Sequence, residues 1–357
     1  MLFICSVKAD YLIVGQGICG SLLSYELMQT GKKVLVIDDN NPATATRIAS
    51  GLINPVTGKR FVASWMIAEL LPVAVETYKA LGRLLHVNLV TPFDILEFHR
   101  TPDELANFRK RLEEGNPYID GAGTAPETSQ YFNSTFGTGA IRNCLLVDLQ
   151  ALLQGWKDVL NKQGAYIQDV FDHRQLTVHA TGIRYKDIEA GRIILCNGVA
   201  GFNNPWFEKL PYTFNKGQAF IASIPGLPKE HIYKQGIKIT PWKDDLFWIG
   251  ASYEWKYEDT KPSAAYRLHV ETQLASWLKL PFEVKEQLVA ERPATVDYKP
   301  FVGFHPAVPQ VGIFNGMGSK GCSQAPYFAQ QLTQYLLHGK PVQPDVDVQR
   351  FSRILCK

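Results

Sequence analysis

The stretch DYLIVGQGICG, residues 10–20, decides the fold of this chain. Its first half, residues 10–14, is a short apolar run with β-branched residues, which predicts a buried strand of a parallel sheet. Residues 21–30 predict a helix that ends at Gly31, and residues 33–37 predict a second apolar strand. The sequence therefore predicts a strand–helix–strand unit with a glycine-rich turn at its first junction.

The glycines of that turn have the spacing of a phosphate-binding loop. Gly15 permits a tight turn, Gly17 lets backbone N–H groups approach a pyrophosphate, and Gly20 lets the helix pack closely on the strand. Ile18 and Cys19 lie between the last two glycines, so they belong to the same candidate site. The place of the motif between a strand and a helix favours a dinucleotide site over a chance turn.

Two acids close the second strand. Asp38 directly ends it, eighteen positions after Gly20, and its carboxylate can accept hydrogen bonds from both hydroxyls of an adenosine ribose. Asp39 is the second candidate. An acid at this position argues against NADP, but the motif alone leaves FAD and NAD open.

A polar loop, NNPATATRIASGLINPVTGKR, follows at residues 40–60. Its small residues can bring backbone amides close to a ligand, but a flexible surface loop explains the same composition equally well. The candidate cofactor contacts in this loop are Arg47, Ser50, Gly51 and Asn54.

Helices and strands alternate along the rest of the chain. Helices are predicted over residues 68–85, 101–114, 148–164, 263–278 and 323–337, and strands over 166–170, 176–179, 183–187, 192–195 and 311–315. The strand at 192–195 is followed by Asn197 and Gly198, which resembles a second sheet edge facing the same ligand. Alternating strands are predicted over 213–250, with a hairpin turn at 243–245.

Aromatic residues crowd the end of this strand region. They are Trp242, Phe247, Trp248, Tyr253, Trp255 and Tyr257. Such residues can line a substrate pocket, but the core of a sheet is the commoner explanation.

A second glycine-rich loop, residues 316–321, joins the strand at 311–315 to the last long helix. Its candidate binding residues are Gly316, Gly318, Lys320 and Gly321. The positive N-terminus of that helix can face the electron-rich pyrimidine edge of a flavin and stabilise its anionic reduced form. This arrangement suits a flavin better than a nicotinamide, and plain α/β packing is the alternative.

Composition excludes several classes of protein. At 357 residues the chain is long enough for about two domains, and no run of about eighteen apolar residues predicts a spanning helix. The net charge of +3 is too mild to indicate nucleic-acid binding. The six cysteines are scattered without metal-ligand spacing, so we expect reduced thiols, no metal and a cytoplasmic protein.

Taken together, these segments resemble the D-amino-acid oxidase family of flavoproteins, of the glycine and sarcosine oxidase type. Three blocks carry the resemblance: DYLIVGQGICG with VLVIDD, then RIASGLINP, and finally ERPATVDYKPFVG followed by IFNGMGSKGCSQAP. The segments PYTFNKGQAF and LFWIGASYE also look like the family's substrate-domain strands.

The resemblance implies an α/β fold with an α+β second domain. A Rossmann-like FAD-binding domain would be discontinuous, formed by residues 1–85, 140–211 and 289–357. A substrate domain built on a mixed or antiparallel sheet would be inserted as residues 86–139 and 212–288.

The implied activity is oxidation of the C–N bond of an amino acid or secondary amine by hydride transfer to flavin N5, giving an imine that hydrolyses. Electrons would then pass to oxygen or a quinone. Arg292 matches the family's arginine that binds a substrate carboxylate, although a structural ion pair is the alternative. Gln218 lies on a strand that often faces the flavin, and Lys320 lies in the closing loop.

Two departures from the family pattern affect specificity and cofactor attachment. Glycine-oxidase-like members carry a second substrate-binding arginine in the closing loop, where this chain has Ser319 beside Lys320. The cysteine context of covalent flavin attachment is not reproduced around Cys322, so we expect non-covalent FAD. Two other functions stay open, a tRNA wobble-uridine modification oxidase and a flavin-fold binder without catalysis.

Overall fold

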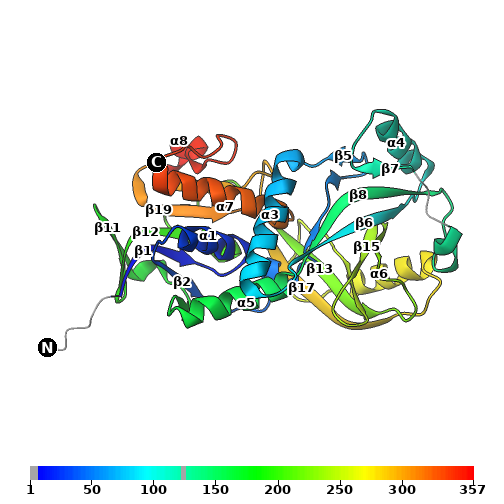
Figure 1. The fold of residues 1–357 in the computed structure, drawn as a ribbon, viewed down its shortest axis with the longest axis horizontal. Coiled ribbons are helices and arrows are strands. Elements are labelled where there is room, and N and C mark those ends of the chain that lie inside the picture. The colour runs from blue at the N-terminus through cyan, green and yellow to red at the C-terminus, as the bar shows by residue number, and fades with distance from the viewer. Residues whose placement is uncertain (1–6, 122–125) are drawn as a thin grey trace.

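The computed structural model describes residues 7–121 and 126–357. Two large sheets lie side by side, the first at the left of Figure 1 and the second at the right. In the described ranges, no helix combines the length and the apolar character that crossing a bilayer requires.

The first sheet has a parallel centre in the order β9–β2–β1–β12–β19. These strands are Tyr166–Gln168, Val34–Asp38, Val7–Val14, Ile188–Leu195 and Val308–Asn315. Strand β18 (Phe301–His305) pairs antiparallel with β19, and β10 (Leu176–His179) and β11 (Gly182–Tyr185) extend β12 as an antiparallel ribbon.

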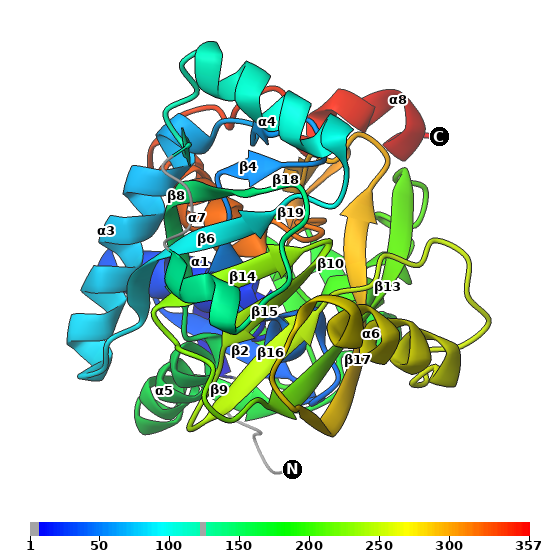
Figure 2. The same ribbon diagram turned by 90° about the vertical axis from the view of Figure 1, so that its right-hand side faces the viewer.

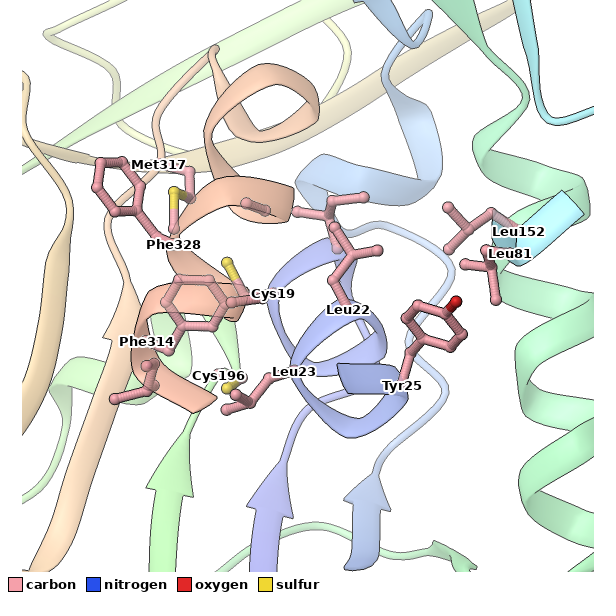
Figure 3. Packing of buried hydrophobic residues seen from close by; sticks show 14 of the residues in the cluster. Cys19, Leu22, Leu23, Tyr25, Leu81, Leu152, Cys196, Phe314, Met317 and Phe328 are labelled. Carbon is pink, nitrogen blue, oxygen red and sulfur yellow. The ribbon is translucent and has the colours of Figure 1, made fainter. Parts of the chain in front are cut away.

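Four helices cover one face of this sheet: α1 (Ile18–Gln29), α3 (Ile67–Leu85), α5 (Leu149–Lys162) and α7 (Gly321–His338). Leu22, Leu23 and Tyr25 of α1 point into the core that these helices share with the sheet (Figure 3). The opposite face packs Leu12 and Val14 of β1 against Leu35 and other apolar residues. Burial on both faces explains why the second half of β1, residues 11–14, is continuously apolar rather than alternating.

The second sheet has the order β17–β13–β16–β15–β14–β6–β8–β3, with β7 beside β8. The strands are Glu283–Thr295, Tyr212–Ser223, Leu246–Gly250, Ile237–Pro241, His231–Gln235, Val90–Phe98, Thr138–Val147, Leu52–Ile53 and, for β7, Ile119–Asp120. Only β14 and β6 are paired in parallel among these neighbours, so the described sheet is mixed. Helix α6 (Ala264–Trp277) covers one face of it (Figure 2).

Alternation along the second sheet separates its two faces. On β15, Ile237 and Ile239 pack toward α6, whereas Lys238 between them points to the other face. Strand β16 does the same, because Phe247 and Ile249 join the α6 core while Trp248 lies on the far side. The far side is the one that faces the first sheet.

The smaller elements connect the large ones. They are α2 (Ala45–Ile48), β4 (Val56–Thr57), β5 (Val62–Ala63), α4 (Pro102–Glu113) and α8 (Ser352–Leu355). The predicted mixture of a Rossmann-like unit with a mixed-sheet unit is therefore confirmed.

Some elements differ from their expected bounds. Helix α1 begins at Ile18 rather than residue 21, because Gly17 is its N-cap and Gly20 already lies inside the helix. Strands β6, β8 and β17 were not predicted, and β6 and β17 each contain a proline that obscures the strand pattern, Pro92 and Pro293. The expected domain boundaries after residues 139 and 288 fall inside β8 and β17, and the division into domains stays a prediction.

Candidate functional site

A cavity of about 690 Å³ lies between the two sheets. Its walls come from the carboxyl ends of β1, β2, β12 and β19 and from the far side of β13, β15, β16 and β17. The volume falls within the range of small-molecule and cofactor sites. Ligands of open α/β sheets bind at this edge, outside the carboxyl ends of the strands.

Tight backbone contacts shape the glycine turn. Gly15 has a φ of +96°, and a Cβ there would lie 2.6 Å from the Cα of Asn197. A Cβ on Gly20 would lie 1.8 Å from the carbonyl oxygen of Gly15. Only glycine fits either position, so the turn can bring the start of α1 directly against the end of β1.

Helix α1 presents its N-terminus to the cavity. Gly17, its N-cap, lines the cavity and provides no side-chain cap. The Ile18 N–H donates to Thr46 Oγ1 at 3.2 Å, and Cys19 lines the cavity beside it. The backbone N–H groups of the first turn and the positive end of the helix dipole make this wall suitable for a pyrophosphate.

Asp38 occupies the end of β2 in a fixed orientation. Its Oδ2 accepts the Gln16 N–H at 2.7 Å, and its Oδ1 accepts the Asn40 N–H at 2.8 Å. Arg47 Nη2 lies 3.6 Å from the same Oδ1, while Asp39 is exposed at the cavity rim. The remaining lone pairs of the Asp38 carboxylate can accept ribose hydroxyls.

The polar loop after β2 forms a wall of the cavity. Ser50 and Gly51 are buried, and a Cβ on Gly51 would lie 1.9 Å from the Val147 carbonyl oxygen of β8. The Trp248 indole N–H donates to the Ile48 carbonyl at 2.9 Å. Of the two explanations that the composition left open, the structure favours the ligand-facing one, because the loop is bonded to the second sheet and lines the cavity.

The two other predicted loops meet this wall from the opposite side. Asn197 and Gly198 line the cavity after β12, and Asn197 Oδ1 is buried without a hydrogen-bond partner in the described part of the chain. Gly318, in the loop before α7, and Gly321, the first residue of α7, also line the cavity. The buried and unpartnered Asn197 Oδ1 can accept a hydrogen bond from a ligand that supplies a donor.

Two predicted cofactor residues do not reach the cavity. Gly20 lies behind Gly15, as described above, and Gly316 lies behind the loop, where a Cβ would come within 2.8 Å of Thr295 Cγ2. Both positions shape the backbone that other residues present to the ligand.

Arg292 extends from β17 into the cavity with a partly buried guanidinium. Its Nη1 donates to Asn215 Oδ1 at 2.6 Å and to the Ser252 carbonyl at 3.0 Å. The guanidinium lies between the backbone of Gly217 and the ring of Tyr253, 4.6 Å from the ring centroid. Within residues 7–121 and 126–357, Nε and Nη2 have no hydrogen-bond partner and Arg292 has no ion pair.

Gln218 is held within the protein rather than free toward a ligand. Its side chain is 0% exposed, and its Nε2 donates to Glu254 Oε1 at 2.7 Å. Its Oε1 accepts the Ser263 N–H at 2.8 Å and Gln287 Nε2 at 2.9 Å. These bonds use the polar atoms of the amide, so a positioning role suits it better than contact with a substrate.

Lys320 caps α7 at the end of the cavity beside Arg292. Its Nζ donates to Ser64 Oγ at 3.1 Å and to the Asn54 carbonyl at 3.4 Å. Burial lowers the pKa of this lysine below its ordinary value.

Three residues that line this end of the cavity were missed from the sequence as site residues. Lys234 and Lys238 lie on strands without a motif, and Tyr253 was expected in a sheet core. Tyr253 lines the cavity; its burial there raises its pKa, but Lys238, Arg292, a side-chain hydrogen bond with Ser319, and Lys320 outweigh burial and lower it. The lysines carried one usable signal, their alternation with apolar residues on predicted strands.

The other aromatic residues divide between the two explanations. Trp248 lines the cavity, whereas Phe247 lies in the core against α6. Trp242, Trp255 and Tyr257 do not line the cavity.

Comparison with known families gives a match over most of the chain. A family model described as FAD dependent oxidoreductase, DAO, matches residues 10–335. An uncharacterized oxidoreductase of Bacillus subtilis, YurR, is 41% identical over 56 residues, which are 16% of this chain and 15% of that protein.

Solved structures share the fold at low sequence identity. An iminodiacetate oxidase from Chelativorans sp. BNC1 is 21% identical with a TM-score of 0.76, covering 96% of this chain and 98% of that one. A glycine oxidase from Geobacillus kaustophilus is 17% identical with a TM-score of 0.79, covering 97% and 98%. An L-proline dehydrogenase from P. horikoshii is 15% identical with a TM-score of 0.76, covering 98% and 99%.

Proposed function

Because the chain belongs to the DAO family of FAD-dependent oxidoreductases, we propose that it oxidises the C–N bond of a small amine or amino acid that carries a carboxylate. Its cofactor is FAD, and its substrates are of the amino-acid or amine class. Arg292 is the reason to expect a carboxylate on the substrate. Its guanidinium lies in the cavity, and among the described residues two of its nitrogens have no hydrogen-bond partner and no acid is paired with it.

FAD fits the cavity in one direction. The ADP half belongs beside Asp38 and the N-terminus of α1, where the carboxylate accepts ribose hydroxyls and the helix dipole faces the pyrophosphate. The pyrimidine edge belongs beside Lys320 and the N-terminus of α7. When bound there, FAD supplies the acceptor for the hydride that leaves the substrate carbon.

The protein's own part is to bind and orient. A guanidinium held by Asn215 and the Ser252 carbonyl can offer its remaining N–H groups to a carboxylate in a paired geometry. Fixing the carboxylate fixes the neighbouring C–N bond, which is the bond that must face the flavin.

Non-covalent attachment of FAD is supported by the state of Cys322. Burial raises the pKa of this thiol to about 12, so it stays protonated and is a poor nucleophile. Acid precipitation should therefore release the flavin into the supernatant, and flavin that stayed with the pellet would contradict the proposal.

The terminal electron acceptor is oxygen or a quinone. Solved structures of the same fold include both an oxidase, of glycine, and a dehydrogenase, of L-proline. Reoxidation of the substrate-reduced protein in air-saturated buffer, with and without a soluble quinone, separates the two acceptors.

The Arg292→Ala substitution tests the carboxylate role. It should slow anaerobic flavin reduction by the best carboxylate-bearing amine at least tenfold at low substrate concentration, about 1.4 kcal/mol of lost transition-state stabilisation. Arg292→Lys should recover part of the rate, because it keeps the charge but not the planar pair of donors. Arg267→Ala removes an exposed arginine paired with Glu271 and should leave the rate unchanged.

Unchanged reduction by the Arg292→Ala protein would assign Arg292 a structural role. A panel of glycine, N-methylglycine, L-proline, iminodiacetate and both enantiomers of common amino acids identifies the substrate. If no amine bleaches the bound flavin, the proposed activity is wrong.

The two other functions considered from the sequence are not favoured. A flavin-fold binder without catalysis conflicts with membership of an oxidoreductase family. A tRNA-modifying oxidase would add RNA binding, which a net charge of +3 does not support. The cytoplasmic location expected from the cysteines stays part of this proposal, and fractionation of cells that express the protein tests it.

A further inference from the structure

Four cationic side chains line the substrate end of the cavity: Lys234, Lys238, Arg292 and Lys320. Lys234 is neutralised by Glu97, whose Oε2 lies 2.5 Å from its Nζ. Arg292 and Lys320 have only neutral hydrogen-bond partners among the described residues. The Lys238 ammonium has neither a hydrogen bond nor an ion pair among the described residues.

The pairing of β14 with β15 directs the Lys238 side chain toward the cavity. Lys238 lies on β15 directly opposite Lys234 of β14. Its strand neighbours Ile237 and Ile239 are buried on the α6 side, so the ammonium must point toward the ligand. Glu97 pairs with Lys234 and not with Lys238, so this register gives Lys238 no counter-ion of its own among the described residues.

The acids of the cavity do not compensate this charge. Asp38 and Asp39 lie at the ribose end, and Asp169 is paired with Lys186. Glu291 lines the cavity near Arg292 but accepts the Tyr257 hydroxyl at 2.6 Å. Tyr253 lies among Lys238, Arg292 and Lys320, and its pKa is lowered by them.

Arg292, Lys320 and Lys238 are three cations without a counter-ion among the described residues. The proposed reaction with a monocarboxylate uses two of them. Lys320, at the N-terminus of α7, lies where negative charge develops on the pyrimidine edge of reduced FAD. Arg292 takes one substrate carboxylate. Lys238 is then left as a half-buried lysine without a counter-ion, and burial lowers its pKa, so its charged form is costly unless the substrate supplies a counter-ion.

We propose that the substrate is an amine that carries two carboxylates, with Arg292 binding one and Lys238 the other. This rests on the proposed function and narrows its substrate class. The reaction itself is unchanged, because a hydride leaves the carbon for FAD, a proton leaves the nitrogen for solvent, and water then cleaves the imine to a carbonyl compound and an amine. The second carboxylate takes no part in bond making and acts in recognition.

A pair of amines that differ by one carboxylate tests the proposal. Iminodiacetate and N-methylglycine share the secondary amine and one acetate arm, and N-ethylglycine controls for size. In the unaltered holoenzyme, anaerobic flavin reduction at low substrate concentration should be at least tenfold faster with iminodiacetate than with either monocarboxylate.

The Lys238→Met substitution should remove this preference. Met has a similar length and no charge, so the ratio of the iminodiacetate rate to the N-methylglycine rate should fall at least tenfold, toward one. Lys256→Met, which removes an exposed lysine, should leave both rates and their ratio unchanged. Ser, Gly or aromatic changes in the pocket are not needed for this comparison.

Binding without turnover provides a second measurement. Thiodiacetate, in which sulfur replaces the amine nitrogen, should perturb the absorbance of bound flavin at lower concentration than methylthioacetate does, and Lys238→Met should abolish that difference. Equal rates and equal binding for one and two carboxylates in the unaltered protein would overturn the dicarboxylate proposal while leaving amine oxidation standing. If neither class of amine reduces the flavin, the proposed function itself fails.

Discussion

At the scale of single residues, Asp38 owes its place to two backbone N–H groups that hold different oxygens of its carboxylate. Gln16 donates to Oδ2 and Asn40 donates to Oδ1. Both oxygens must therefore be acceptors, which an amide side chain cannot provide. The carboxylate keeps further lone pairs toward the ribose end of the cavity.

The Asp38→Asn substitution should weaken FAD binding at least tenfold. The new amide group would face one of the two N–H donors, and hydrogen bonds to a charged acceptor are worth about 1.5–3 kcal/mol. Titration of the apoprotein with FAD, followed by quenching of flavin fluorescence, measures the change. Asp39→Asn is the matched control, because Asp39 is exposed and, among the described residues, its carboxylate accepts a hydrogen bond only from the Asn41 N–H. Equal losses in the two variants would contradict a specific role for Asp38.

Residues of the site that lie close together in sequence could be predicted, and residues brought together by the second sheet could not. Gly15, Gly17 and Asp38 belong to one strand–helix–strand unit, whose backbone geometry dictates the residue types. Lys238 and Tyr253 reach the cavity only through the pairing of β14, β15 and β16. Strand register depends on non-local contacts, so no local pattern distinguishes Lys238 from a surface lysine.

At the scale of elements, α1 is the helix whose position controls the cofactor wall. It packs against β1 and α7, with Leu22, Leu23 and Cys19 in the shared core (Figure 3). Trp156 of α5 donates to Ser24 of α1 at 2.8 Å. These contacts can form only if the first turn of α1 lies directly against the end of β1.

The Gly20→Ala substitution should therefore displace α1. A methyl group 1.8 Å from the Gly15 carbonyl cannot be accommodated by a rotamer change, so we expect a loss of about 3 kcal/mol in the free energy of unfolding. Denaturant unfolding of the apoprotein measures it, and FAD affinity should fall in parallel. Gly155→Ala in α5 is the control, because its nearest contact is the flexible Leu85 side chain at 3.0 Å; a loss in Gly20→Ala no larger than in Gly155→Ala would contradict the packing argument.

Long amphipathic helices and apolar strands were the elements that the sequence predicted well. The pattern of buried leucines predicts helix α5. The helix begins after Asp148, whose side chain accepts the Ala151 N–H. Strand β17 was missed because its first half is charged and its second half contains Pro293. Its thirteen residues are held by pairing with β13 rather than by their own pattern.

At the scale of the whole molecule, the cavity belongs to neither sheet alone. The loop after β2 lines it and is bonded to Trp248 of the second sheet, while β17 of the second sheet carries Arg292 beside the closing loop of the first. We propose a division that follows the sheets, with β8 and the whole of β17 in the substrate domain. Limited proteolysis that yields fragments ending inside β8 or β17 would argue against this division.

FAD should stabilise both sheets together, because it contacts the walls that each provides. At a free concentration one hundred times its dissociation constant, FAD should add about 2.7 kcal/mol to the free energy of unfolding. FMN at the same concentration should stabilise far less, since it lacks the adenosine that the Asp38 end of the cavity would bind.

Thermal unfolding of the apoprotein, observed by circular dichroism and by tryptophan fluorescence, measures both effects. Trp156 packs beside α1, which covers the first sheet, whereas Trp248 and Trp277 pack with the second sheet. Coincident transitions by both signals therefore indicate joint stabilisation. If FMN stabilised the protein as well as FAD does, the glycine turn and Asp38 would not be the site of the ADP half.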